Sequence, residues 1–215
     1  MTACTAETAR CADAPSYQYA LRECCRGHLI QMMRDLHEAF TAAEIRYWLD
    51  YGTLLGAVRN PLTTWRDYPW LGVDSDEPLK PGIIPHDKDV DICALADDYW
   101  RARRICERLC EEKGYIVQRR AGWSMLKVLL SGTNNTAVDI FFWRCQGTTL
   151  RRMRYLSVDR FKGRDLEWDQ VFPLTTVEWE GLQLPAPRDP EWLCEYRYGP
   201  NWMTPVAANN NGVLR

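Results

Sequence analysis

The stretch from Ile83 to Leu95 constrains this chain most. It carries three carboxylates at alternate positions, at Asp87, Asp89 and Asp91, and ends in apolar residues spaced two apart. This alternation predicts a β-strand that enters a core, with Asp89 and Asp91 projecting from one face. Two neighbouring carboxylates repel each other unless a positive charge lies between them, and a hard divalent cation with oxygen ligands is the natural candidate.

Two alternatives compete with a metal site here. A calcium loop of the EF-hand type would need a glycine directly after the third aspartate and a glutamate six residues further on. Ile92 and Asp98 occupy those positions, so this calcium loop is excluded. An acidic turn that is simply solvated stays open on this stretch alone.

Upstream, residues 45–51 have strand character and lead directly into Gly52-Thr53 and a short apolar helix. A strand, a Gly-Thr turn and a helix N-terminus place backbone N–H groups and a hydroxyl where a phosphate can bind. Gly52 has no Cβ to obstruct such a ligand. Many strand-to-helix turns carry Gly-Thr without binding anything, so an ordinary turn is the alternative.

A third acidic position lies downstream, in a strand predicted over residues 137–143. Asp139 is flanked there by Val138 and Ile140, and a carboxylate among apolar neighbours is costly to bury unless it is paired or bound to metal. The turn cluster at 131–136 predicts that residues 125–130 pair back on this strand. Lys127 then lies near Asp139, unless it is an ordinary lysine at a sheet edge.

The remaining pattern predicts helices, strands and one long loop. Apolar spacing predicts a helix over residues 19–40, and Asp97 and Asp98 can cap a helix that runs to Lys113 before Gly114. Strands are expected at 115–119, a hairpin at 177–184, and a helix after Asp189-Pro190 that ends before Gly199. Residues 60–82 hold four prolines and form an irregular loop. Three aromatic residues of this loop, Trp65, Tyr68 and Trp70, would stack on a sugar ring of the acceptor. The alternative is that the loop is a surface insertion without a function.

Composition sets wide limits. The 215 residues suffice for one large domain, 46% of them are apolar, and a net charge of −2 gives no argument for a nucleic-acid or membrane surface. No apolar run of the length of a membrane span and no apolar signal-peptide segment is visible in the sequence. Ten tryptophans and ten tyrosines suit sugar rings or bases, but they suit a plain core equally well.

Nine cysteines fall into two groups. Five are scattered through apolar patterns and are expected to pack as small hydrophobic residues. The other four crowd the first 25 positions, where they predict disulfides, a metal knuckle or an arm with free thiols; they are Cys4, Cys11, Cys24 and Cys25.

These parts occur together in a known family. The run Tyr47 to Arg59, followed by Ile83 to Asp91, resembles the LicD/fukutin family, and within it the fukutin-related branch. The resemblance covers about Cys4 to Pro205. It implies an α+β chain with the nucleotidyltransferase fold of the polymerase β superfamily, in which helices flank a mixed sheet. It also implies a Cys-rich arm at 1–26, a catalytic domain at 27–205 with an insertion at 60–82, and a tail at 206–215.

The resemblance also implies a reaction: transfer of a phospho-alcohol, of the ribitol phosphate, glycerol phosphate or phosphocholine class, from a CDP-alcohol to a hydroxyl of a glycan or glycoprotein. By carry-over, Asp89, Asp91 and Asp139 are the catalytic carboxylates and hold Mg²⁺ or Mn²⁺. Gly52, Thr53, Arg59, Lys127 and Asp87 would contact the donor, and Cys4, Cys11, Cys24 and Cys25 would hold a structural Zn²⁺.

Two other classes of function remain open on the sequence. One is a nucleotidyltransferase that uses a nucleoside triphosphate and releases pyrophosphate. The other is an inactive relative that only binds glycans, against which the presence of all three carboxylates argues. The eukaryotic relatives imply the Golgi lumen, although this sequence shows no anchor; a homo-oligomer also stays open.

Overall fold

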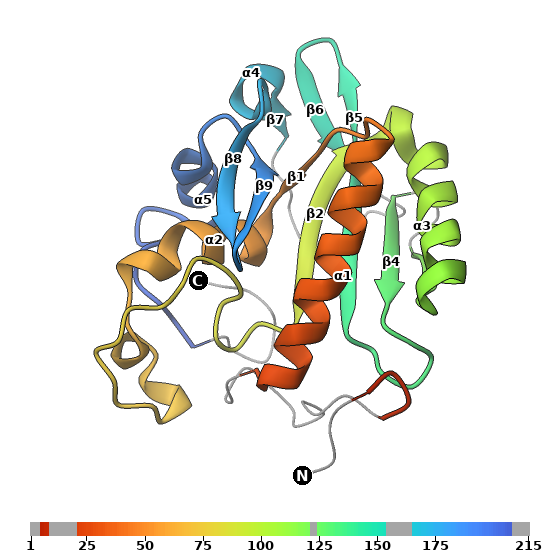
Figure 1. Cartoon of the computed structure of the whole chain (residues 1–215). Helices are drawn as coiled ribbons and strands as arrows, with labels where there is room; N and C mark the ends of the chain where they lie inside the picture. Colours follow the sequence, from red (N-terminus) through yellow and green to blue (C-terminus); the bar gives the residue numbers. More distant parts are fainter. Residues whose placement is uncertain (1–4, 9–20, 121–123, 154–164, 208–215) are drawn as a thin grey trace.

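The computed structural model describes residues 5–8, 21–120, 124–153 and 165–207 (Figure 1). Its centre is a mixed sheet of seven strands, in the order β1-β2-β5-β4-β3, with β6 paired to β5 and β7 to β6. β2 and β5 run parallel, and the other neighbours are antiparallel. The strands are β1 (Tyr47–Leu49), β2 (Asp89–Leu95), β3 (Ile116–Arg120), β4 (Met125–Leu129), β5 (Ala137–Gln146), β6 (Thr149–Arg152) and β7 (Leu166–Glu167).

Two helices cover one face of this sheet: α1 (Glu23–Ala42) and α3 (Tyr99–Lys113). Figure 1 shows α1 lying across β2 and β5, with α3 beside it. The apolar alternation of the central strands places Val90 and Ile92 in the core, and both are fully buried. The aspartates at the alternate positions of β2 therefore face away from α1 and α3.

A second set of elements packs near the end of β1. It contains α2 (Tyr51–Arg59), the short helix α4 (Trp168–Val171), α5 (Pro190–Tyr198) and a separate hairpin of β8 (Thr175–Trp179) and β9 (Leu182–Ala186). Asp189 caps α5, because its carboxylate accepts a 2.9 Å hydrogen bond from the Trp192 N–H. The hairpin packs on β1 and α2, so it lies close to the start of the acidic strand.

The insertion at 60–82 is more ordered than an irregular loop. It contains three short 3-10 turns, at Asn60–Leu62, Trp65–Asp67 and Pro69–Leu71, and a bridge joins Thr64 to Pro78. Tyr68 anchors it, since this side chain is fully buried. The expectation that Tyr68 stacks on an acceptor sugar is therefore wrong, because its ring has no accessible face. Trp65 and Trp70 are half-buried.

Most elements match the sequence expectations, although several boundaries differ by a few residues. The helix expected over residues 19–40 begins at Glu23. The strand expected over 45–51 ends at Leu49, because Asp50 turns the chain and caps α2 through a 2.7 Å hydrogen bond from the Tyr51 N–H. α3 ends where expected, at Gly114 in the left-handed conformation. None of the helices in the described part of the chain combines the length and apolar character that crossing a bilayer requires.

Candidate active site

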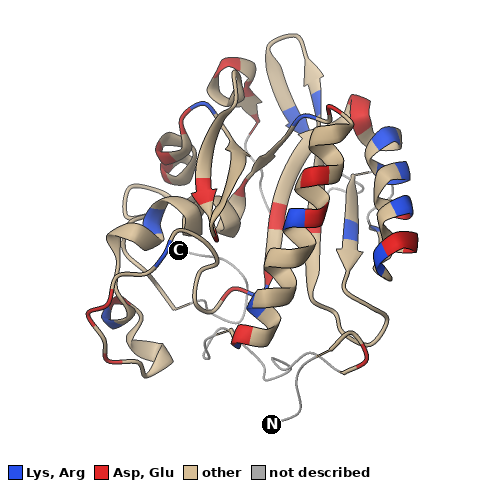
Figure 2. Ribbon diagram, in the orientation of Figure 1, with Lys and Arg blue, Asp and Glu red and all other residues tan. Residues whose placement is uncertain are grey.

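Parallel pairing of β2 with β5 brings two of the acidic positions together. Asp91 lies opposite Asp139 in the register, and Asp89 precedes Asp91 by two residues on the same face of β2. Figure 2 shows acidic segments side by side on β2 and β5, with a basic segment on β4 next to them. Residues 48 positions apart in the sequence thus form one acidic surface on the sheet face away from α1 and α3.

The carboxylates of this surface repel one another. Burial raises the pKa of Asp91 well above its usual value, and the carboxylates of Asp89, Asp139, Asp87 and Asp50 raise it further. Such a shift means that the ionised form of Asp91 is disfavoured in the protein alone. A cation between these carboxylates would favour the ionised form again.

Lys127 supplies one positive charge at this surface. Its Nζ lies 2.7 Å from Oδ1 and 2.9 Å from Oδ2 of Asp139, across the β4–β5 register. The pair is partly accessible to solvent, with 21% of the lysine and 10% of the aspartate side chain exposed. An ammonium group has three N–H donors, so the two contacts to Asp139 leave a third for another ligand.

The first turn of α2 holds the acidic strand in place. The hydroxyl of Thr53, which is buried, accepts a 2.7 Å hydrogen bond from the backbone N–H of Asp91. A Cβ on Gly52 would lie only 2.5 Å from Oδ2 of Asp87, so a larger residue there would displace the Asp87 carboxylate. Gly52 therefore leaves space for the Asp87 side chain, and Thr53 binds the backbone of Asp91.

Arg59 lies at the other end of α2 and is buried. Its guanidinium donates to the carbonyl of Trp202 and to the hydroxyl of Tyr68, at 3.2 Å in each case, and lies 5.9 Å from the centre of the Tyr68 ring. These contacts join α2 to the insertion and to the end of the described chain. The structure does not place Arg59 on the surface that carries Asp89, Asp91 and Asp139.

One buried ion pair beside this surface was not expected from the sequence. Arg197 on α5 forms two parallel hydrogen bonds with Asp50, with Nε to Oδ1 at 3.0 Å and Nη2 to Oδ2 at 2.7 Å. Cys93 also donates to Asp50, at 3.5 Å from Sγ to Oδ2. A buried aspartate at a strand end signals the need for a cation, but Arg197 lies 147 positions away and no local pattern could identify it.

Aromatic rings border the acidic surface beside this pair. Tyr51 has a positive φ of 50°, an uncommon conformation for a residue with a side chain. Its ring packs edge-on against Phe141, and the guanidinium of Arg152 lies over both of these rings. The guanidinium of Arg197 lies over Tyr51 and Trp143. The wall next to Asp139 is thus aromatic and positively charged.

The carboxylates of this surface suit a magnesium ion that substrate and water help to coordinate, and not a metal ion held by protein ligands alone. Within the described residues, no three His, Cys, Asp or Glu side chains converge as ligands of one metal. Mg²⁺ is commonly held by one or two carboxylates, with substrate phosphates and water completing its shell. Asp89 and Asp91, two residues apart on one face of β2, are the carboxylates that could hold such an ion.

The cysteines of the expected zinc loop are only partly described. Cys4 and Cys11 lie outside the described residues. Cys25 is fully buried in the apolar stripe of α1, and Cys24 beside it is half-buried.

A family model for the LicD/FKTN/FKRP nucleotidyltransferase domain matches residues 80–189. This chain belongs to that family. Its nucleotidyltransferase fold and its mixed sheet flanked by helices, which the sequence predicted, are thereby confirmed. The match contains Asp87, Asp89, Asp91, Lys127 and Asp139, whereas α2 and the N-terminal cysteines precede it.

Individual relatives extend the similarity beyond the family match. An uncharacterized protein, RP689, of Rickettsia prowazekii is 26% identical over 81% of this chain and 54% of its own length. The ribitol 5-phosphate transferases FKRP of mouse and human are each 25% identical over 92% of this chain and 38% of theirs. The chain thus spans between about two fifths and half of the length of these relatives.

Solved structures resemble the chain more loosely. The lincosamide antibiotic adenylyltransferase LnuA, with lincomycin bound, aligns at a TM-score of 0.41 and 12% identity, over 78% of this chain and 81% of that one. A putative nucleotidyltransferase from Thermotoga maritima aligns at 0.35 and 13%, over 80% and 82%. The family match, and not these superpositions, identifies the fold.

Proposed function

We propose that this LicD-family domain transfers a phospho-alcohol from a CDP-alcohol to a hydroxyl group of a glycan or glycoprotein, releasing CMP, in a metal-dependent reaction. The observation that carries the proposal is the acidic surface: Asp89 and Asp91 on β2, with Asp139 in register on β5. The family match and the similarity to ribitol 5-phosphate transferases support it.

Each residue of the surface has a role in such a transfer. Asp89 and Asp91 would hold Mg²⁺ or Mn²⁺, which when bound would neutralise charge on the donor diphosphate and on the departing CMP. Lys127 would donate its third N–H to a donor phosphate oxygen while it stays paired with Asp139. With Lys127 still paired to it, Asp139 would accept the proton of the attacking hydroxyl. Alternatively, Lys127 would leave Asp139 for the phosphate, and Asp139 would then complete the metal site.

The sequence predicted that Gly52, Thr53 and Arg59 contact the donor directly, and we propose a different role for these α2 residues. Gly52 and Thr53 contact Asp87 and the Asp91 N–H, so they would act on the donor by fixing the acidic strand, together with the helix N-terminus that they form. A direct contact of Arg59 with the donor would require that it leave Trp202 and Tyr68.

A donor screen tests the proposal. Purified protein is incubated with Mg²⁺ and CDP-ribitol, CDP-glycerol or CDP-choline, and CMP release is measured with and without glycan acceptors. We expect one donor to be used, and Asp89→Asn or Asp91→Asn to keep less than about a tenth of the turnover, because catalytic metal contributions are worth several kcal/mol.

Asp97→Asn is the matched control for these variants. Asp97 is an exposed carboxylate just beyond the opposite end of β2, and its loss should leave turnover unchanged. Release of pyrophosphate from a nucleoside triphosphate, with no use of CDP-alcohols, would instead establish a nucleotidyltransferase. Absence of turnover combined with glycan binding would establish an inactive relative.

We also propose that Cys4, Cys11, Cys24 and Cys25 hold a structural Zn²⁺. The position of Cys24 and Cys25 at the start of α1 would let such a site tether the arm to the domain. Elemental analysis should find about one zinc per chain, and chelation should lower the melting temperature, since binding free energy at such sites is folding free energy. Two disulfides without zinc in a mass spectrum would refute this.

A further inference from the structure

The segment from Pro81 to Pro85, directly before the acidic strand, is held by its backbone. The carbonyl of Pro81 accepts from the Glu180 N–H at 2.9 Å, and the Gly82 N–H donates to the carbonyl of Gly56 at 3.3 Å. The Asn60 amide donates to the carbonyls of Gly82 and Ile83, at 3.2 and 3.1 Å.

The far end of the segment is held as well. The Ile84 carbonyl accepts from the Asp87 N–H at 2.8 Å, and the Pro85 carbonyl accepts from the Leu21 N–H at 2.6 Å. A loop tied at so many peptide groups has one position relative to α1, α2 and the hairpin.

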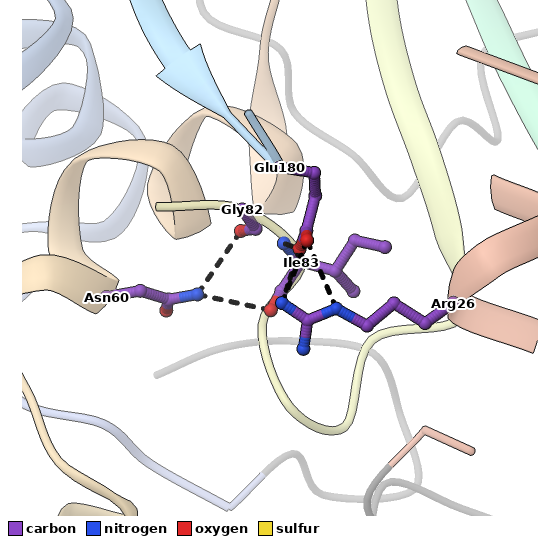
Figure 3. A network of polar contacts seen from close by, with 5 residues as sticks. All are labelled: Arg26, Asn60, Gly82, Ile83 and Glu180. Carbon is purple, nitrogen blue, oxygen red and sulfur yellow. Dashed lines mark hydrogen bonds and ion pairs between the residues drawn. The ribbon is translucent and has the colours of Figure 1, made fainter. Parts of the chain in front are cut away.

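Glu180 is the centre of this arrangement (Figure 3). Its Oε1 accepts a 2.8 Å hydrogen bond from the Ile83 N–H, and both of its oxygens contact the guanidinium of Arg26 on α1 at 2.7 to 3.1 Å. Only 6% of the Glu180 side chain is exposed. One carboxylate thus joins the hairpin, α1 and the segment that leads into the acidic strand.

The backbone at Glu180 gives a second, independent observation. It lies at the tip of the β8–β9 hairpin with φ at 50°, followed by Gly181 at 76°. Two-residue turns of this kind favour glycine, asparagine or aspartate, because a longer side chain is strained at positive φ. A glutamate there is explained by what its carboxylate holds, since strained residues cluster at functional sites.

The next contacts connect this network to the acidic surface. A Cβ on Gly82 would lie 2.1 Å from Oε1 of Glu180, so the carboxylate fills the space that a side chain would take. Asp87 follows the held segment, and its Oδ2 closely approaches Gly52 in the first turn of α2. A shift of residues 81–85 therefore moves Asp87 relative to Asp89 and Asp91, which the pairing of β2 with β5 and the hydroxyl of Thr53 hold separately.

We propose that Glu180, fixed by Arg26, is a positioning residue: it sets where the chain enters the acidic strand, and so the spacing of the carboxylates that act on the donor. This role rests on the proposed function for its effect on turnover. A misplacement of catalytic groups by about 1 Å can cost roughly 100-fold in rate, so a residue that touches no substrate can control turnover.

Two substitutions of Glu180 separate its contacts. Glu180→Ala removes the acceptor for Ile83 N–H and the partner of Arg26, whereas Glu180→Gln keeps an acceptor oxygen and loses the charge. We expect Glu180→Ala to lower kcat with CDP-alcohol by roughly 10–100-fold with a smaller change in KM. Glu180→Gln should give a kcat between those of Glu180→Ala and the wild type, because its oxygen still accepts from the Ile83 N–H while its NH2 group faces the N–H donors of Arg26. Glu178→Gln, on an exposed residue of the same hairpin, is the matched control and should change nothing.

Hydrogen exchange gives a readout independent of turnover. In Glu180→Ala the peptide covering residues 81–89 should exchange at least about tenfold faster, and in Glu180→Gln at a rate between those of Glu180→Ala and the wild type. Unchanged exchange in Glu180→Ala, or faster exchange with unchanged kcat, would overturn the positioning role.

The failures of the two proposals can be told apart. If the wild type uses no CDP-alcohol, the proposed function fails, while the exchange rates still decide whether Glu180 fixes the segment. Should Glu180→Ala not fold, Arg26→Lys replaces it: a lysine keeps the charge but loses the two-point contact, so exchange of 81–89 should rise and kcat should fall. No change of either quantity in Arg26→Lys would contradict the proposal.

Discussion

Two carboxylate–cation pairs occupy the same side of the sheet and differ in burial. Asp50 and Arg197 are 0% and 8% exposed, and two parallel hydrogen bonds join them. Asp139 and Lys127 are 10% and 21% exposed, and a single ammonium group contacts both carboxylate oxygens. The first pair has rigid geometry and no room for a ligand, whereas the second retains a donor and access to water.

The difference in burial indicates that the two pairs have different roles. Asp50 also accepts from the Tyr51 N–H and from Cys93, so the pair with Arg197 fastens α2 to α5 and β2. Lys127 and Asp139 lie on two neighbouring strands that are already joined by their backbones, so the fold needs their contact less. We expect the first pair to contribute to stability and the second to turnover.

Removal of Arg197 should have the largest effect. Arg197→Met leaves Asp50 buried without its cation, which should lower the free energy of unfolding by about 3–5 kcal/mol. Urea denaturation measures this. Arg188→Met, on an exposed arginine just before α5, is the control and should change stability little. A loss below about 1 kcal/mol for Arg197→Met would break the comparison.

Removal of the lysine charge should act on the reaction instead. Lys127→Met keeps the length of the side chain and removes its charge, so CMP release at saturating donor should fall by roughly 10–100-fold. The loss of stability should be smaller than for Arg197→Met, because Lys127 and Asp139 are more exposed than Arg197 and Asp50. Lys113→Met, which removes a half-exposed lysine 3.4 Å from Asp35, is the control. Unchanged turnover in Lys127→Met would show that both pairs are structural.

The two pairs also show what the sequence could predict. Lys127 and Asp139 lie on adjacent strands joined by a short turn, so alternation and the turn cluster sufficed to bring them together. The same holds for β2, α3 and the capped α5, whose signals are local. Asp50 and Arg197 are joined by tertiary packing, and no periodicity encodes a contact between such distant positions. The burial of Arg59 was unpredictable for the same reason: its partners lie in the insertion and near the C-terminus.

His86 tests how burial changes the pH dependence of stability. Burial lowers the pKa of His86 from 6.5 to about 4, and the positive charge of Arg59 contributes. The unfolded chain therefore binds a proton between pH 6.5 and 4 that the folded protein does not, so stability falls as the pH falls through this window. His86→Gln should reduce the difference in unfolding free energy between pH 7 and pH 5 by about 1–2 kcal/mol, measured by urea denaturation. An identical pH dependence in the variant would contradict this.

The smallest effect on stability is expected for a solvent-exposed ion pair. Arg66 lies 3.0 Å from Asp74 and 2.8 Å from Asp76 in the insertion, but these side chains are 58%, 86% and 70% exposed. Salt and solvent screen such pairs, and the entropy of holding long side chains offsets their attraction. Asp74→Asn should therefore leave both the denaturation midpoint and turnover unchanged.

Tyr68→Ala is the opposite case, because it removes the buried anchor of the same insertion and should lower the midpoint clearly. A destabilised Asp74→Asn would mean that surface charge, and not burial of Tyr68, holds the insertion, and the ranking of ion pairs by burial would fail.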